Sequence, residues 1–127
     1  MELRDEVFQV GLNFNVGNGG KRLNVSQRQK LSLARALIKK PDILIVNRAL
    51  TALDSRTQKK IIERVLDMSA GQNGSDPFGI FWVLQAPRFA EEFQRVLVFD
   101  KGALAEDDTP ANLLKQDGHY KALISSA

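Results

Sequence analysis

The chain has 127 residues, 43% hydrophobic and 26% charged, which fits one small globular domain and excludes disordered and fibrous classes. It has no cysteine and one histidine, His119, which excludes a disulfide framework, a thiolate nucleophile and a histidine- or cysteine-built zinc site. The 18 Lys and Arg residues are spread along the chain among 15 Asp and Glu residues, for a formal net charge of +3, so we expect no nucleic-acid partner. No apolar run approaches the roughly 18 residues of a membrane span.

The first predicted helix follows a weakly patterned stretch, residues 1–22, that ends in a Gly/Asn-rich loop. Asn24 and Gln27 have the spacing of a capping box, in which each side chain bonds the other residue's backbone N–H. Pro41 ends the helix after two lysines that suit its negative end. Helical spacing predicts that its buried stripe consists of Leu31, Ala34 and Ile38.

A strand and a second helix come next. The continuous apolar run 43–46 predicts a strand buried on both faces of a parallel sheet. After a loop over residues 47–54, Ser55 and Gln58 again have capping-box spacing. The helix that they predict ends near Gly71 and has Ile62, Val65 and Leu66 along one face.

Two further apolar runs, 79–84 and 95–99, predict strands, with Phe81 and Trp82 in the core. Alternating strands and helices imply right-handed crossovers and a parallel sheet in an α/β fold. A turn at residues 100–102 predicts a hairpin strand over 103–106. Two helices close the chain, one opened by Thr109 and Pro110 and running through Leu114, the other over residues 120–124.

Two segments carry a family resemblance. LNVSQRQKLSLARALIKKPDILIVNRALTALD, residues 23–54, is similar to the region of ATP-binding cassette (ABC) ATPases that runs from the signature motif through the Walker B strand to the D-loop. RVLVFDKGALAEDDTPANLLKQDGHYKAL, residues 95–123, resembles that family's C-terminal hairpin and helices, with a Gly-His-Tyr ending similar to the exporter-type subgroup. The resemblance implies the C-terminal part of a P-loop NTPase fold. Residues 1–40 would end the helical subdomain with the signature helix, and residues 41–127 would form the C-terminal half of the catalytic core.

The signature motif is degenerate. In the family a Ser and two Gly residues at the head of a helix meet the γ-phosphate of ATP held by the opposite subunit. Asn24 stands in place of the Ser, Val25 and Ser26 in place of the glycines, and Gln27 follows. The branched Val25 obstructs close approach of the backbone to phosphate. Asn24 either contributes to nucleotide binding or only caps its helix.

The Walker B strand of the family ends in Asp and Glu, where this chain has Asn47 and Arg48. An amide lacks the charge that Mg²⁺ prefers, and a guanidinium does not act as a general base. Arg48 would instead neutralise phosphate charge, pair with Asp54, or remain a solvated surface residue. The family's switch histidine corresponds to Gln85, which cannot move a proton near neutral pH. We therefore expect no intact catalytic residue and no metal site.

Asp54, the D-loop aspartate, is retained, although an Asp ahead of a helix is also a routine cap. His119 is expected to be a surface or packing residue. The phosphate-binding pattern G-x-x-x-x-G-K-[ST] does not occur in the sequence. ATP and Mg²⁺ are the cofactors of the intact family, and none is expected for this chain alone.

The resemblance implies a nucleotide-binding-domain fragment of a transporter, itself catalytically incompetent, which supplies the signature and D-loop side of an ATP sandwich. Its expected partners are an N-terminal half with the P-loop, a second ABC ATPase domain and a transmembrane domain, at the cytoplasmic face of the membrane. An uncovered apolar sheet face also suggests homo-oligomers. Alternatives are a defective half-site paired with a competent one, and a regulatory or interaction module that does not bind nucleotide. A DNA-repair or chromosome-structure ATPase is disfavoured by the exporter-like C-terminus.

Overall fold

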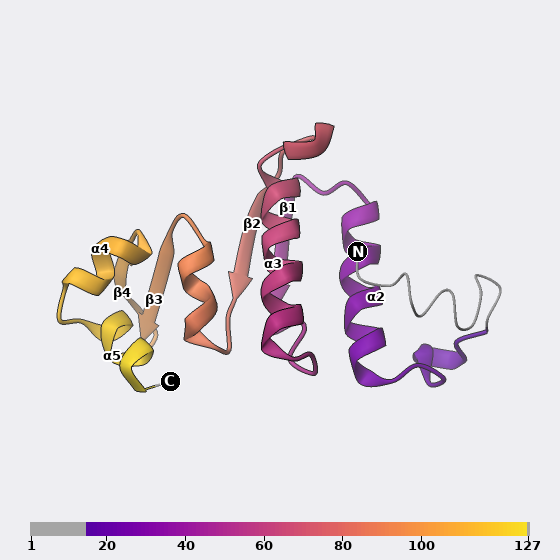
Figure 1. Cartoon of the computed structure of the whole chain (residues 1–127), viewed down its shortest axis with the longest axis horizontal. Helices are drawn as coiled ribbons and strands as arrows, with labels where there is room; N and C mark the ends of the chain where they lie inside the picture. Colours follow the sequence, from indigo (N-terminus) through magenta and orange to yellow (C-terminus); the bar gives the residue numbers. More distant parts are fainter. Residues whose placement is uncertain (1–14, 127) are drawn as a thin grey trace. The chain divides into compact units, whose positions relative to one another are not determined.

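A computed structural model describes residues 15–126, so the predictions for residues 1–14 lie outside the part described. The fold is mixed α/β and divides into two compact units, Met1–Val83 and Leu84–Ala127, each described below by itself. The elements of the first unit are η1 (Asn18–Gly20), α2 (Val25–Ile38), β1 (Ile43–Asn47), α3 (Ser55–Ser69), η2 (Gln72–Gly74) and β2 (Gly79–Val83) (Figure 1).

The predicted start of α2 is confirmed. The Gln27 N–H donates to Asn24 Oδ1 at 2.9 Å, and the Asn24 N–H donates to Gln27 Oε1 at 3.0 Å, so the capping box is complete. The predicted buried stripe is wrong, because Leu33 and Leu37 are buried whereas Ile38 is 78% exposed. Since α2 has apolar residues on more than one side, packing against β1 and α3 selects the buried face, and helical spacing alone does not.

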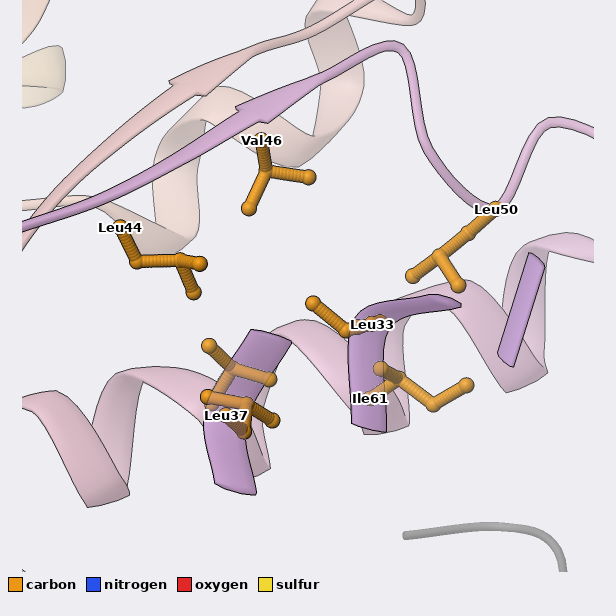
Figure 2. Close-up of a cluster of buried hydrophobic side chains, with 7 residues drawn as sticks. Leu33, Leu37, Leu44, Val46, Leu50 and Ile61 are labelled. Carbon is orange, nitrogen blue, oxygen red and sulfur yellow. The ribbon is translucent and has the colours of Figure 1, made fainter. Parts of the chain in front are cut away.

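β1 and β2 form a two-stranded parallel sheet, in register from Ile43 opposite Gly79 to Asn47 opposite Val83. In β1, Leu44 and Val46 point into a core that they share with α2 and α3 (Figure 2). The core residues of this cluster are Leu33, Leu37, Leu44, Val46, Leu50, Ile61 and Val65.

The other face of this sheet is not covered by the described residues. Ile43 and Ile45 are 59% and 69% exposed, so the prediction of a strand buried on both faces is wrong here. Phe81, predicted to lie in the core, is 57% exposed, whereas Trp82 packs against the core as predicted. Both helices that pack on the sheet lie on the side of Leu44 and Val46, which accounts for the difference.

The cap of α3 differs from the predicted Ser55–Gln58 capping box. Asp54 is the cap, and its carboxylate accepts the Thr57 N–H and the Thr57 hydroxyl, each at 2.8 Å. Ser55 is the first helical residue, and Gln58 Nε2 donates to the Leu53 carbonyl at 2.7 Å. Ile62 and Val65 are buried as predicted, together with Ile61, and the left-handed Gly71 (φ 77°) follows the helix end.

The second unit contains η3 (Pro87–Glu92), β3 (Val96–Asp100), β4 (Ala103–Asp108), α4 (Pro110–Lys115) and α5 (His119–Ser126). β3 pairs antiparallel with β4, which confirms the predicted hairpin. The expectation that the third strand joins the parallel sheet is wrong, because β3 and β4 form a separate two-stranded sheet. The turn between them has Lys101 and Gly102 at φ 49° and 80°, which suits a tight hairpin. The predicted cap at Thr109 is confirmed, and Ala90, Val98, Leu113 and Tyr120 form the core.

Candidate functional site

The head of α2 is organised by Asn24. Its side-chain oxygen accepts the Gln27 N–H and also the Ser26 hydroxyl, the latter at 2.8 Å. Val25, the next residue, is 50% exposed at the first turn of the helix. The geometry therefore makes Asn24 a helix cap, the second of the two roles that the sequence allows. A role of residues 24–27 in contacting phosphate stays a prediction.

At the carboxyl end of β1, Asn47 and Arg48 both have exposed side chains. The Arg48 backbone N–H donates to the Val83 carbonyl at 3.2 Å, and Arg48 adopts the left-handed φ of 51°. In residues 15–126 no contact joins Arg48 to Asp54, so the predicted ion pair is not formed. The Asp54 carboxylate instead accepts hydrogen bonds from Thr57. The bond from the Thr57 backbone N–H contributes most to lowering the pKa of Asp54, and the bond from the Thr57 hydroxyl adds to it.

Gln29 is a positioning residue that sequence reasoning missed. Its Nε2 donates to the Thr51 hydroxyl at 3.0 Å, and its Oε1 accepts the Ala52 N–H at 2.9 Å. One side chain of α2 thus fastens the loop that follows β1. Leu50 anchors the same loop in the core, where its side chain is 1% exposed and its backbone adopts a φ of 68°. No local pattern marks Gln29, because its partners lie 22 and 23 residues away.

The ligands expected of a magnesium site are not present at this strand end. Asn47 offers a neutral amide oxygen without the charge of a carboxylate, and Arg48 places a cation where the family has a second carboxylate. In the part of the chain that the structure describes, no group of three or more His, Cys, Asp or Glu side chains is arranged to hold a metal. The residues at the end of β1 therefore do not fit the Mg²⁺ of the resembled family.

The two remaining predicted positions lie in the second unit. Gln85 is exposed and follows β2 by two residues, whereas Asn47 and Arg48 belong to the first unit. His119 is exposed at the start of α5, which agrees with the predicted surface position. Gln85 stays a prediction as the counterpart of the switch histidine.

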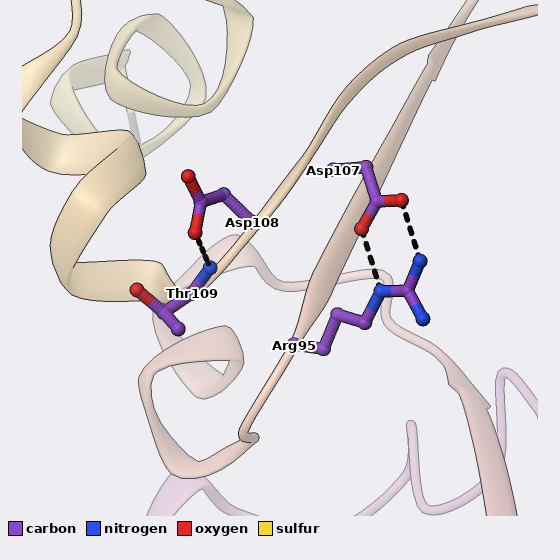
Figure 3. Close-up of polar contacts among 4 residues, drawn as sticks. All are labelled: Arg95, Asp107, Asp108 and Thr109. Atoms are coloured by element: carbon purple, nitrogen blue, oxygen red, sulfur yellow. Dashed lines mark hydrogen bonds and ion pairs between the residues drawn. The ribbon is translucent and has the colours of Figure 1, made fainter.

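An ion pair in the second unit joins Arg95, the residue before β3, to Asp107 of β4. Arg95 donates through Nε and Nη2 to the two oxygens of Asp107, each at 2.6 Å (Figure 3). The side-chain hydrogen bond from Arg95 lowers the pKa of Asp107, and Asp107 raises that of Arg95. Asp108 accepts from Asn112 and from the Thr109 N–H, which lowers its pKa as well. These contacts hold the hairpin and the start of α4, and they are structural.

No family model matches the chain. Over most of its length, however, the chain is homologous to ABC exporter ATP-binding/permease proteins. It is 39% identical over 109 residues to the beta-(1→2)glucan export ATP-binding/permease protein NdvA of Rhodopseudomonas palustris, covering 86% of this chain and 17% of that protein. It is 34% identical over 118 residues to ATP-binding cassette sub-family C member 3 of Homo sapiens, covering 93% of this chain and 7% of that protein.

A solved structure agrees with these relatives. A bacterial Atm1-family ABC exporter with ATP bound matches with a TM-score of 0.76 and 28% identity over 98% of this chain and 21% of that chain. The chain thus spans about a fifth or less of the proteins that it matches. None of the helices within residues 15–126 has the length and hydropathy of a membrane span.

Proposed function

We propose that this chain is part of the nucleotide-binding domain of an ABC exporter, and that it supplies the signature and D-loop side of an ATP sandwich without hydrolysing ATP itself. Residues 24–27 and Asp54 would face a nucleotide held by a second domain. In this proposal the fold is the C-terminal part of a P-loop NTPase, with residues 1–40 ending the helical subdomain and residues 41–127 belonging to the catalytic core. The homology to exporters supports the assignment.

The catalytic incompetence rests on one observation, the Asn47–Arg48 pair at the end of β1. Hydrolysis of a phosphoanhydride needs a group that orients and polarises the attacking water. A carboxamide and a guanidinium do not accept a proton near neutral pH, and Gln85 carries no charge. The exposed side chains of Asn47 and Arg48 therefore offer no base at the position where the family has one.

The proposed partners follow from the same assignment. They are a segment that carries a P-loop, a second ABC ATPase domain, and the transmembrane part of an exporter, which would hold the chain at the cytoplasmic face of the membrane. The uncovered apolar face of the β1–β2 sheet supports at least one such contact, since Ile43, Ile45, Phe81 and Val83 are about half exposed or more.

A second candidate is an interaction module that does not contact nucleotide. Val25 favours it, because this branched side chain is 50% exposed at the first turn of α2 and obstructs close approach of a phosphate to the backbone N–H groups there. The two candidates differ in what ATP does to association with another ABC domain.

The test mixes the purified chain with a separate ABC ATPase domain that has an intact P-loop, and follows association by sedimentation velocity with and without ATP and Mg²⁺. We expect ATP-dependent association that Ser26→Glu abolishes, since a carboxylate at the head of α2 repels phosphate. The matched control Ser125→Glu, on exposed α5, leaves association unchanged. Association that is indifferent to ATP supports the interaction module.

Incompetence is tested separately by phosphate release from ATP with the purified chain alone. We expect no turnover above buffer. Turnover that disappears on replacing Asn47 or Arg48 with Ala would contradict the proposal.

A further inference from the structure

A groove with a volume of about 430 Å³ opens in the first unit between α2 and the carboxyl half of β1. One wall is α2, and the other is β1 with the first residues after it. The polar residues that line it are Arg28, Gln29 and Ser32 on α2, and Asn47 and Arg48 on the facing wall.

The groove is positive. Arg28 and Arg48 line it from its two walls, and none of the lining residues within the described part of the chain is acidic. α2 contains no Asp or Glu anywhere between Val25 and Ile38. The acid that follows in the loop, Asp54, is engaged by Thr57 at its own helix cap. Two guanidinium groups without a lining carboxylate attract a small anion.

The wall that bears Arg48 is held in one conformation. Arg48 and Leu50 are non-glycine residues at φ 51° and 68°, a region that persists only where the surroundings enforce it. The Arg48 N–H is bonded to Val83, and Leu50 is buried in the core. Gln29 fastens the next two residues of the loop through its two hydrogen bonds. A preorganised wall reduces the entropy lost when a ligand binds.

The rest of the lining suits an anion of modest size. Ser32 contributes a hydroxyl donor and Asn47 an amide donor. Val25, Leu33 and Ala36 add apolar surface along the α2 wall.

We propose that this groove binds an oxyanion of the phosphate class without a metal ion, with Arg28 and Arg48 supplying the charge and Ser32 and Asn47 the additional donors. A guanidinium donates two parallel hydrogen bonds to phosphate oxygens, which makes phosphate a better ligand than a halide. The inference goes beyond the exporter assignment and does not depend on it, because it needs neither a P-loop nor a second domain.

The test is a titration of the ¹⁵N-labelled 127-residue chain with inorganic phosphate in EDTA at constant ionic strength, with sodium chloride as the matched addition. We expect saturable shifts of the backbone amides of Ser32, Asn47 and Arg48. Arg28→Gln and Arg48→Gln each weaken binding by about tenfold, the loss of one charge-assisted contact. Arg35→Gln, which removes an α2 charge outside the lining, changes affinity by less than about twofold, as expected for an exposed cation.

The proposal is overturned by shifts that do not saturate, by equal losses in Arg35→Gln and Arg28→Gln, or by binding that appears only with Mg²⁺. A parallel titration with sodium acetate checks the class of ligand. If acetate binds as tightly as phosphate, the proposal is also overturned. If the ¹⁵N spectrum shows that Arg48→Gln does not fold, the loss of phosphate affinity in Arg28→Gln alone tests the proposal. Because neither ATP nor another domain is present, a failure here leaves the exporter assignment unaffected.

Discussion

Gly118 and Glu106 are two residues of the second unit that depend on each other. The Glu106 carboxylate accepts the Tyr120 N–H at 2.8 Å at the first turn of α5. A Cβ at Gly118 would overlap that carboxylate. The Glu106 carboxylate from β4 thus caps the start of α5, and the absence of a side chain at Gly118 lets it lie there. This contact secures Tyr120, which is 2% exposed in the core.

Gly118→Ala is expected to destabilise the second unit by roughly 0.5–1.5 kcal/mol, because the flexible Glu106 carboxylate must move aside and gives up its hydrogen bond to the Tyr120 N–H. Urea unfolding followed by tyrosine fluorescence and circular dichroism measures it. The matched control is Gly79→Ala, whose Cβ would meet no atom closer than 3.6 Å. Equal losses in the two variants would show that the Glu106 contact is not the cause.

At the scale of elements, α2 and α3 are both capped by a side chain that precedes them, Asn24 and Asp54. These caps also occupy the positions that the proposed function assigns to nucleotide contact. Capping uses the side-chain oxygens as acceptors. A phosphate is itself an acceptor and would need the amide N–H groups of Asn24, so at this residue capping and phosphate contact use different atoms.

Asn24→Ala removes the acceptor for the Gln27 N–H, and we expect a loss of about 1 kcal/mol in the free energy of unfolding. Asn24→Asp keeps an acceptor at the same place and places its charge at the positive end of α2, so it should retain full stability. Chemical denaturation of the three proteins at neutral pH compares them. A full loss in Asn24→Asp would contradict the capping role.

At the scale of the whole molecule, one face of the β1–β2 sheet has no covering among the described residues. Its exposed side chains are Ile43, Ile45, Phe81 and Val83. None is charged, so two copies that meet at this face bring no like charges together. Each of the two strands also has one edge without a strand partner in residues 15–126.

We therefore predict that the chain self-associates at micromolar concentrations. Phe81→Lys should shift the distribution in sedimentation velocity toward monomer, because the ammonium group disfavours burial of the face. Leu104→Lys, a similarly exposed apolar position in the second unit, should leave it unchanged. Light scattering that shows a stable monomer of the unmodified chain at high concentration would contradict the prediction.

Acid should destabilise the chain. Hydrogen bonds lower the pKa values of four aspartates below 3.8, namely Asp54, Asp107, Asp108 and Asp117. A carboxyl whose folded pKa is depressed contributes stability above its unfolded pKa and loses it as the pH falls through the folded value. Urea midpoints should therefore be flat from pH 7 to about 5 and fall below about 4.

The control for the acid effect is Asp107→Asn, which removes the Arg95 ion pair. This variant should start with a lower midpoint at pH 7 and lose less on acidification. The same acid loss in both proteins would show that Asp107 does not contribute to it.

Features set by neighbouring residues could be predicted from the sequence. The capping box of α2, the cap at Thr109 and the strand positions depend on a few adjacent side chains, and the structure confirms them. That Arg48 is neither a magnesium ligand nor a general base also follows from residue type alone, because a guanidinium is a cation with only hydrogen-bond donors. The similarity to ABC exporters was also recognisable from the sequence, because the family's motifs follow one another in the same order along this chain.

Features set by distant residues were decided only by tertiary structure. Packing of α2 against β1 buried Leu33 and Leu37 and left Ile38 exposed, although spacing alone favoured Ile38. Strand pairing assigned β3 to the hairpin, and long-range hydrogen bonds gave Gln29 its hold on the loop after β1. Burial, strand pairing and loop anchoring depend on interactions between residues far apart in the chain, so a local sequence pattern does not predict them.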